Sequence, residues 1–184
     1  MAEEGVHDFR KAKLKARDRL KLSKDVPLPA NHDVQLAMND YLLLFTPEDH
    51  IQARRLRMMD MARDAMNFFR HYKPKLVADF LSHAVSKDAI IELHLQTQSP
   101  ESVAHFLHEH DIPFEQQEKQ IQFGTNDSTV VPVFKLLADN QPFNLIIFTE
   151  IQARQSPRNT ITGIAQYRIN AADINAWLKT NHSV

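Results

Sequence analysis

A change in hydrophobic periodicity at Pro74 most constrains what this chain can fold into. Before Pro74, apolar residues recur at the spacing of one helix face, whereas after it short apolar runs alternate with polar residues, as in strands. Proline lacks an amide hydrogen and disfavours a helical conformation in the residue before it, so it also ends the early helices. The pattern therefore predicts an α+β fold, with an N-terminal helical region followed by a mixed β-sheet domain with flanking helices.

The first part of the helical region is strongly basic. Residues 7–24 carry eight lysines and arginines against two aspartates, a local net charge of +6, and Pro27 and Pro29 follow. We predict a basic N-terminal helix, residues 1–24, that is separable from the rest of the fold. Either it is a solvated surface helix, or it contacts a nucleotide or nucleic acid, because clustered cations gain affinity by releasing counterions from phosphates.

Residues 32–72 are predicted to form a helical hairpin region. The first helix runs from His32 to Phe45, and Thr46-Pro47 starts a second helix that continues to about Tyr72. We expect both apolar stripes to be buried, although the methionine-rich helices could instead bind a protein partner. The stripes are Val34, Ala37, Met38, Tyr41 and Phe45 in the first helix, and Ile51, Met58, Met59, Ala62, Met66 and Phe69 in the second.

Residues 73–184 are predicted to form the sheet domain. A helix capped by Ser99 is expected to reach about His110, and a closing helix from Ala171 to Lys179 is expected to be capped by Asn170. Pro132 indicates that its strand starts late or lies at an edge of the sheet. The expected strands are 75–81, 89–96, 113–118, 120–123, 130–137 and 142–149.

Composition excludes several classes of function. The chain has no cysteine, which rules out disulfides and cysteine-ligated zinc, and it has only three glycines and no glycine-rich phosphate loop. Its longest apolar runs, such as residues 41–45, are too short to span a membrane, and no signal-peptide core follows the charged N-terminus. We expect a cytoplasmic protein that does not enter a membrane.

Glu92 and His94 are the first candidate site residues. They occupy alternate positions of a predicted strand, Ile91 to Leu95, so their side chains share a face and could meet a metal. Mg²⁺ prefers carboxylate oxygens, and a softer metal such as Zn²⁺ or Mn²⁺ would need a third ligand that the sequence does not identify, so the metal is unknown. The alternative is that both residues are solvent-facing positions of an edge or half-covered strand.

Residues 76–149 resemble the core of the polymerase-beta-type nucleotidyltransferase superfamily. In that superfamily a strand ends in a small Gly-Ser turn, a later strand carries an acid-apolar-acid pair, and a third acid lies on a neighbouring strand. Here Ser82 stands at the turn, Glu92 and His94 at the pair, and Asn144 at the third position. The chain is also similar, over most of its length, to proteobacterial proteins described as nucleotidyltransferase-like.

The resemblance implies a nucleotidyltransferase-like fold with a pocket formed by Ser82, Glu92, His94 and Asn144. Two-metal phosphoryl transfer needs anionic ligands that bridge both ions, which an imidazole and an amide cannot supply. We therefore expect a degenerate, non-catalytic domain that acts as a binding or regulatory module, with weak Mg²⁺ or nucleotide binding at most. The alternatives are an active metal-dependent nucleotidyltransferase with an altered metal site, and a helical protein-interaction module on an α+β scaffold.

Arg154 and Arg158 are the candidate phosphate-binding residues. They follow the last long predicted strand within a polar segment, and we expect this segment to be a loop. Guanidinium groups suit bidentate contacts to phosphate oxygens, so the loop either binds phosphate or is a plain connection.

Overall fold

The structure is a computed structural model of the chain and describes residues 9–82, 85–86, 89–124, 127–159 and 161–181. Within these ranges it contains six α-helices and a six-stranded mixed sheet, so the predicted α+β architecture is confirmed. Helices α1 (Phe9–Arg19), α2 (Asn31–Phe45) and α3 (Glu48–Phe68) precede the sheet, as predicted. Nowhere among the described helices is there a stretch with both the length and the hydropathy that a bilayer span requires.

The sheet combines one parallel pair with antiparallel pairs. Its strands lie in the order β3-β4-β5-β2-β1-β6, and β2 and β5 are the parallel pair at its centre. The carboxyl ends of β2 and β5 therefore meet at the same edge of the sheet. The bounds are β1 Lys75–Val77, β2 Ile91–Gln96, β3 Phe114–Gln122, β4 Ser128–Ala138, β5 Gln141–Phe148 and β6 Arg168–Ile169.

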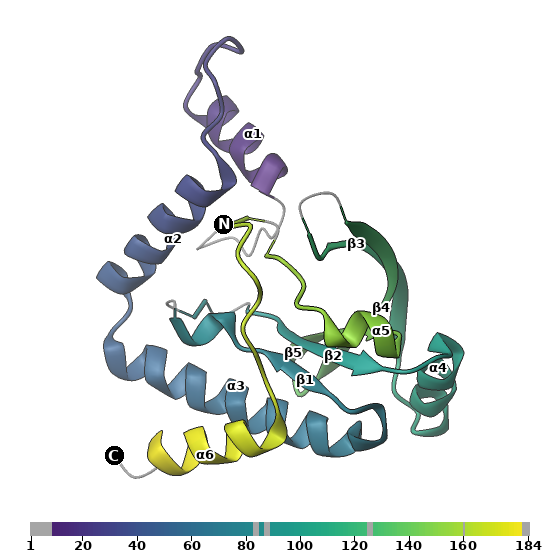
Figure 1. Cartoon of the computed structure of the whole chain (residues 1–184). Coiled ribbons are helices and arrows are strands. Elements are labelled where there is room, and N and C mark those ends of the chain that lie inside the picture. The colour runs from purple at the N-terminus through teal and green to yellow at the C-terminus, as the bar shows by residue number, and fades with distance from the viewer. Residues whose placement is uncertain (1–8, 83–84, 87–88, 125–126, 160, 182–184) are drawn as a thin grey trace.

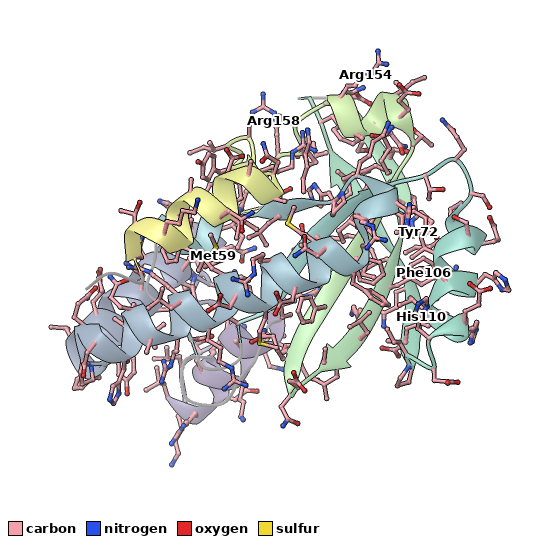
Figure 2. All side chains as sticks on the ribbon, turned by 90° about the horizontal axis from the view of Figure 1, so that it is seen from below. Met59, Tyr72, Phe106, His110, Arg154 and Arg158 are labelled. Atoms are coloured by element: carbon pink, nitrogen blue, oxygen red, sulfur yellow. The ribbon has the colours of Figure 1, made fainter. Side chains whose placement is uncertain are left out.

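One face of the sheet carries the main hydrophobic core. Figure 1 shows α3 and α6 (Ala171–Asn181) lying side by side against the sheet, and Figure 2 labels Met59 on α3 where that helix runs beside α6. The predicted apolar stripe of α3 is confirmed, since all six of its members are buried. Full burial of such a side chain contributes about 1.5–3 kcal/mol, so this stripe attaches α3 firmly to the sheet.

A turn between α3 and β1 fixes where β1 begins. The 3₁₀ helix η1 (Arg70–Tyr72) ends at Lys73, which has a left-handed backbone conformation with φ of 45°. Tyr72 is held on α4 (Pro100–Glu109) because its hydroxyl donates to the carbonyl of Ser102 at 3.0 Å. Figure 2 shows Tyr72 beside Phe106 of α4, and these rings lie 5.7 Å apart between centroids.

The other face of the sheet has a smaller apolar cluster and less helical cover. A short helix, α5 (Glu150–Arg154), lies on this face near the ends of β2 and β5, where its Ala153 packs against the cluster (Figure 1). The rest of the face carries polar side chains. The buried members of the cluster are Ile121, Val131, Val133, Ile146 and Phe148.

Three strand predictions are corrected. The predicted strand 75–81 stops at Val77 and is followed by a 3₁₀ turn, η2 (Asp79–Ser82), because the Asp79 carboxylate accepts hydrogen bonds from the Tyr167 amide and the Asn159 side chain. The predicted strands 113–118 and 120–123 are one strand, β3. Pro132 lies within β4 rather than at its start.

The position of Pro132 has a structural reason. It pairs with Glu118 of β3, but the pairing of β4 with β5 begins only at Val133. The proline therefore lies just beyond the segment where β4 has neighbours on both sides, and its missing amide costs no hydrogen bond to β5.

The predicted burial of the α2 stripe is wrong. Only Leu42 of α2 is buried, whereas Tyr41 is 37% exposed and Phe45 is 68% exposed. The described part of α1 buries no residue. Figure 1 shows the reason, because α1 and α2 extend away from the sheet and contribute no member to either hydrophobic cluster.

Candidate functional site

Glu92, His94 and Asn144 lie on one face of the sheet. In the parallel pair of β2 and β5, Glu92 is opposite Asn144, and His94 follows Glu92 by two positions on the same strand. Their face is the one with the smaller apolar cluster. Ser82 is the last residue of η2, and its side chain lies outside the described part of the structure.

The interpretation of these residues as solvent-facing positions does not fit the structure. Strand β2 lies between β5 and β1 rather than at an edge. The His94 residue is only 3% exposed and the Glu92 side chain 16% exposed. A buried carboxylate requires partners, which the fold supplies.

Three side chains donate hydrogen bonds to the Glu92 carboxylate. Its Oε2 accepts from the Lys119 ammonium at 2.7 Å, and its Oε1 accepts from Gln166 Nε2 at 3.3 Å and from His94 Nε2 at 3.2 Å. Of these three donors, only His94 was predicted from the sequence as a site residue. Lys119 comes from β3, and Gln166 comes from the segment just before β6.

This network controls the ionisation of Glu92. Burial alone would raise the pKa of the Glu92 carboxyl, but the hydrogen bond from His94 and the charge of Lys119 outweigh it and lower that pKa to about 2. The carboxylate is therefore ionised across the physiological range. Its negative charge is balanced by an ammonium group of the same chain.

His94 is held as a neutral imidazole. Burial lowers its pKa, and the opposing influence of Glu92 does not compensate. A neutral ring that interacts with a carboxylate through Nε2 must carry its proton there, which leaves Nδ1 as an acceptor. Nδ1 is buried and has no hydrogen-bond partner in the described structure, and the ring packs edge-on against Phe148 with the centroids 4.8 Å apart.

The residues present do not fit a pair of magnesium ions. Two such ions need several bridging anionic oxygens, but Asn144 and His94 are uncharged and the one carboxylate among the three is bonded to Lys119. In the described ranges, no three histidine, aspartate or glutamate side chains are grouped so that they could hold a metal. The arrangement is a network of hydrogen bonds centred on Glu92, with donors that come from the chain itself.

A cavity of about 230 Å³ lies next to this network, at the carboxyl ends of β2 and β5. His94 forms part of its wall, so the cavity and the Glu92 network share one residue. Four of the nine other lining residues are basic. The lining residues are Lys73, Lys75, His94, Leu95, Gln96, Phe148, Glu150, Ala153, Arg154 and Arg168.

The structure separates the two candidate phosphate-binding arginines. Arg154 lies on α5 rather than in a loop, because Thr149 and Gln152 form a reciprocal capping box that starts this helix. Arg154 lines the cavity, where its Nη2 donates to Glu150 Oε1 at 2.7 Å. Arg158 does not line it and donates instead to the carbonyl of Gly163 at 2.7 Å.

Figure 2 shows Arg154 on α5 and Arg158 on the segment that follows it. The capping box Thr149-Glu150-Ile151-Gln152 was the sequence signal for the helix, and it was missed. Lys73, Lys75 and Arg168 were also missed as lining residues. Lys73 and Lys75 lie on either side of Pro74 where β1 begins, whereas Arg168 lies on β6, and the pairing of β1 with β6 brings them together.

Comparison with known proteins adds no relative to this picture. A scan against models of protein families, a search of curated proteins and a search of solved structures each found no match to the chain. The resemblance to nucleotidyltransferases therefore stays a prediction from the residue pattern.

Proposed function

We propose that this chain is a cytoplasmic, non-catalytic binding or regulatory module built on a degenerate nucleotidyltransferase-like domain. The contact that carries the proposal is the ion pair of Lys119 Nζ with Glu92 Oε2 at 2.7 Å. An ammonium of the protein takes the place beside the carboxylate that a metal ion would need. The site is thereby neutralised without an exogenous cation.

The electrostatics of the site favour this proposal over an active enzyme. Glu92 accepts from three donors, and two of them, His94 and Lys119, lower its pKa against the effect of burial because they stabilise the charged form. A metal ion would have to displace Lys119 and leave that ammonium without its counterion, which costs free energy in a partly buried site. Asn144 supplies an amide oxygen but no charge.

Enzymatic assay tests the proposal. The unmodified chain is incubated with each nucleoside triphosphate and Mg²⁺ or Mn²⁺, and release of pyrophosphate is measured. We expect no release above that of a Glu92→Gln variant, which keeps the shape of the side chain but removes its charge. Metal-dependent release that disappears in this variant would support the alternative, an active nucleotidyltransferase with an altered metal site.

A second candidate function is a helical protein-interaction module, and the exposed apolar residues of α2 favour it. Leu44 is 79% exposed, Phe45 68%, and Leu36 and Leu43 each 49%. A cavity of about 570 Å³ also lies between α1 and α2, with a mainly apolar wall. Apolar surface of this kind is typical of association sites.

Sedimentation velocity tests whether this surface associates with a second copy of the chain. Association that depends on concentration and is abolished by Leu44→Lys would support the interaction module. A chain that remains monomeric, with the same sedimentation coefficient in the Leu44→Lys variant, would argue against self-association through α2.

A further inference from the structure

Arg168 is a half-buried cation without an acidic partner in the described structure. Its Nη2 donates to the carbonyl of Gln155 at 2.6 Å and contacts the Ser156 hydroxyl at 3.4 Å, both uncharged acceptors. Its Nη1 is buried and makes no hydrogen bond to any described residue. Burying a charge without a counterion is costly, so an anion from solution would be stabilised beside this guanidinium.

The cavity next to Arg168 gathers further positive charge. Four of its lining side chains are cations, namely Lys73, Lys75, Arg154 and Arg168, and one, Glu150, is an acid. Glu150 is already paired with Arg154 at 2.7 Å. The wall thus carries an excess of three positive charges, which attracts anions into a small space.

The location of the cavity is one where ligands commonly bind. Gln96 and Phe148, the last residues of the parallel strands β2 and β5, both line it. In open sheets the crevice beyond the carboxyl ends of parallel strands is a usual ligand site. His94 also belongs to the wall, and its Nδ1 is a second buried polar atom that has no hydrogen-bond partner among the described residues.

Lys73 places its ammonium group at the cavity although its backbone adopts a conformation that is unfavourable for residues other than glycine. Its φ is 45° and its ψ is 56°, in the left-handed region that glycine adopts without strain. A side chain in this region costs about 1 kcal/mol relative to glycine. Lysine at position 73 therefore lowers the free energy of unfolding relative to glycine, but it adds a positive charge to the cavity wall.

We propose that this cavity binds the phosphoryl group of a small phosphorylated molecule. The guanidinium of Arg168 can donate to two phosphate oxygens, and the lysines supply point charges around the others. A volume of about 230 Å³ admits a phosphoryl group with a small body, and it lies below the range of about 300–1,000 Å³ that accommodates drug-sized ligands. The inference rests on the proposed function, since it names the ligand class of the binding module.

Calorimetric titration with inorganic phosphate, in the absence of metal and nucleotide, tests the proposal on the full chain. Buffers are matched in ionic strength with sodium chloride. We expect saturable binding of phosphate that weakens about tenfold in Lys75→Gln, because one charge-assisted contact is lost. Lys179→Gln is the matched control, since it removes the same charge from an exposed position on α6 that lies outside both the cavity wall and the basic N-terminal segment.

Lys73→Gly distinguishes a binding role from a structural one. Glycine relieves the left-handed conformation, so the variant should melt at a higher temperature than the parent in the absence of phosphate while it binds phosphate more weakly. A residue that served only the fold would not give these opposite changes.

The proposal is overturned if the parent shows no phosphate binding beyond the chloride control, or if Lys75→Gln and Lys73→Gly both bind as the parent does. Its failure is separate from failure of the proposed function. Metal-dependent pyrophosphate release would contradict the non-catalytic module, whereas the phosphate titration involves neither metal nor nucleotide.

Discussion

Lys119 and Glu92 form a 2.7 Å ion pair although two strands, β4 and β5, lie between their own strands in the sheet. Neighbouring strands in a sheet are about 4.8 Å apart, so a flat sheet would place β3 and β2 beyond the reach of a lysine side chain. Figure 1 shows how the contact arises, because β3 and β4 curve strongly. The curvature brings Lys119 across the sheet face to Glu92.

The ion pair should stabilise the fold measurably. In a double-mutant cycle with Lys119→Met and Glu92→Gln, we expect a coupling free energy of about 1–3 kcal/mol, since the carboxylate is mostly buried and the lysine partly exposed. Urea unfolding of the four proteins at neutral pH gives this quantity. A coupling energy near zero would mean that the two groups do not interact in solution.

Acid should destabilise the parent through Glu92. The pKa of Glu92 is about 2 in the folded chain, below its ordinary value of 4.5, so the unfolded chain binds more protons as pH falls. The stabilisation is therefore fully present above about pH 5 and is lost as pH falls toward 2, by up to about 3 kcal/mol. Urea unfolding at several pH values should show a steeper loss for the parent than for Glu92→Gln, and parallel curves would contradict the assignment.

His94 should remain neutral at neutral pH with its proton on Nε2. Burial lowers the pKa of His94 below its ordinary value of 6.5, and Glu92 accepts from Nε2. Nitrogen-15 chemical shifts of the ring distinguish the two tautomers and the charged form. A charged ring at pH 7, or a neutral ring protonated on Nδ1, would contradict the described network.

The basic N-terminal helix should be separable from the fold. α1 buries no residue, and neither hydrophobic cluster includes a residue of α1 or α2. A chain that lacks residues 1–24 should keep a cooperative thermal transition with a melting temperature close to that of the parent. An unfolded product would show that α1 is part of the core.

The same helix is predicted to contact polyanions. Lys13 is engaged within the chain, since its Nζ donates to the Pro29 carbonyl at 2.9 Å and to Asn31 Oδ1 at 2.8 Å, but the segment retains a large positive excess. Binding of single-stranded RNA should weaken steeply with salt, with a slope set by the number of phosphates contacted. The chain without residues 1–24 is the control. Equal binding by the control would exclude α1 as the contact.

The sequence predicted those parts of the fold whose signals are local. The α3 stripe repeats over several turns, and the alternation around Glu92 and His94 placed both on one strand face. The α2 stripe looked equally amphipathic, but periodicity identifies an apolar face without showing whether another element covers it. In this chain α2 extends away from the sheet.

The candidate site was predictable only in part, for a related reason. Glu92, His94 and Asn144 carry local chemistry, but the partner that decides the chemistry of Glu92 is Lys119, which lies 27 residues away in sequence. Neither hydrophobic pattern nor motif spacing specifies how far a sheet curls. Arg168 is likewise one residue of a two-residue strand, which is too short to give a periodic signal.

Titration with Mg²⁺ tests most directly whether Lys119 takes the place of a metal ion at Glu92. Calorimetry should detect no binding of Mg²⁺ to the parent, whereas the variant Lys119→Met, His94→Asp, Asn144→Asp should bind it, since three carboxylates would then share one sheet face without the ammonium. The same variant with Glu92→Gln added is the control and should bind more weakly. Tight binding of Mg²⁺ by the parent, abolished by Glu92→Gln, would show that Lys119 does not exclude a metal ion from Glu92.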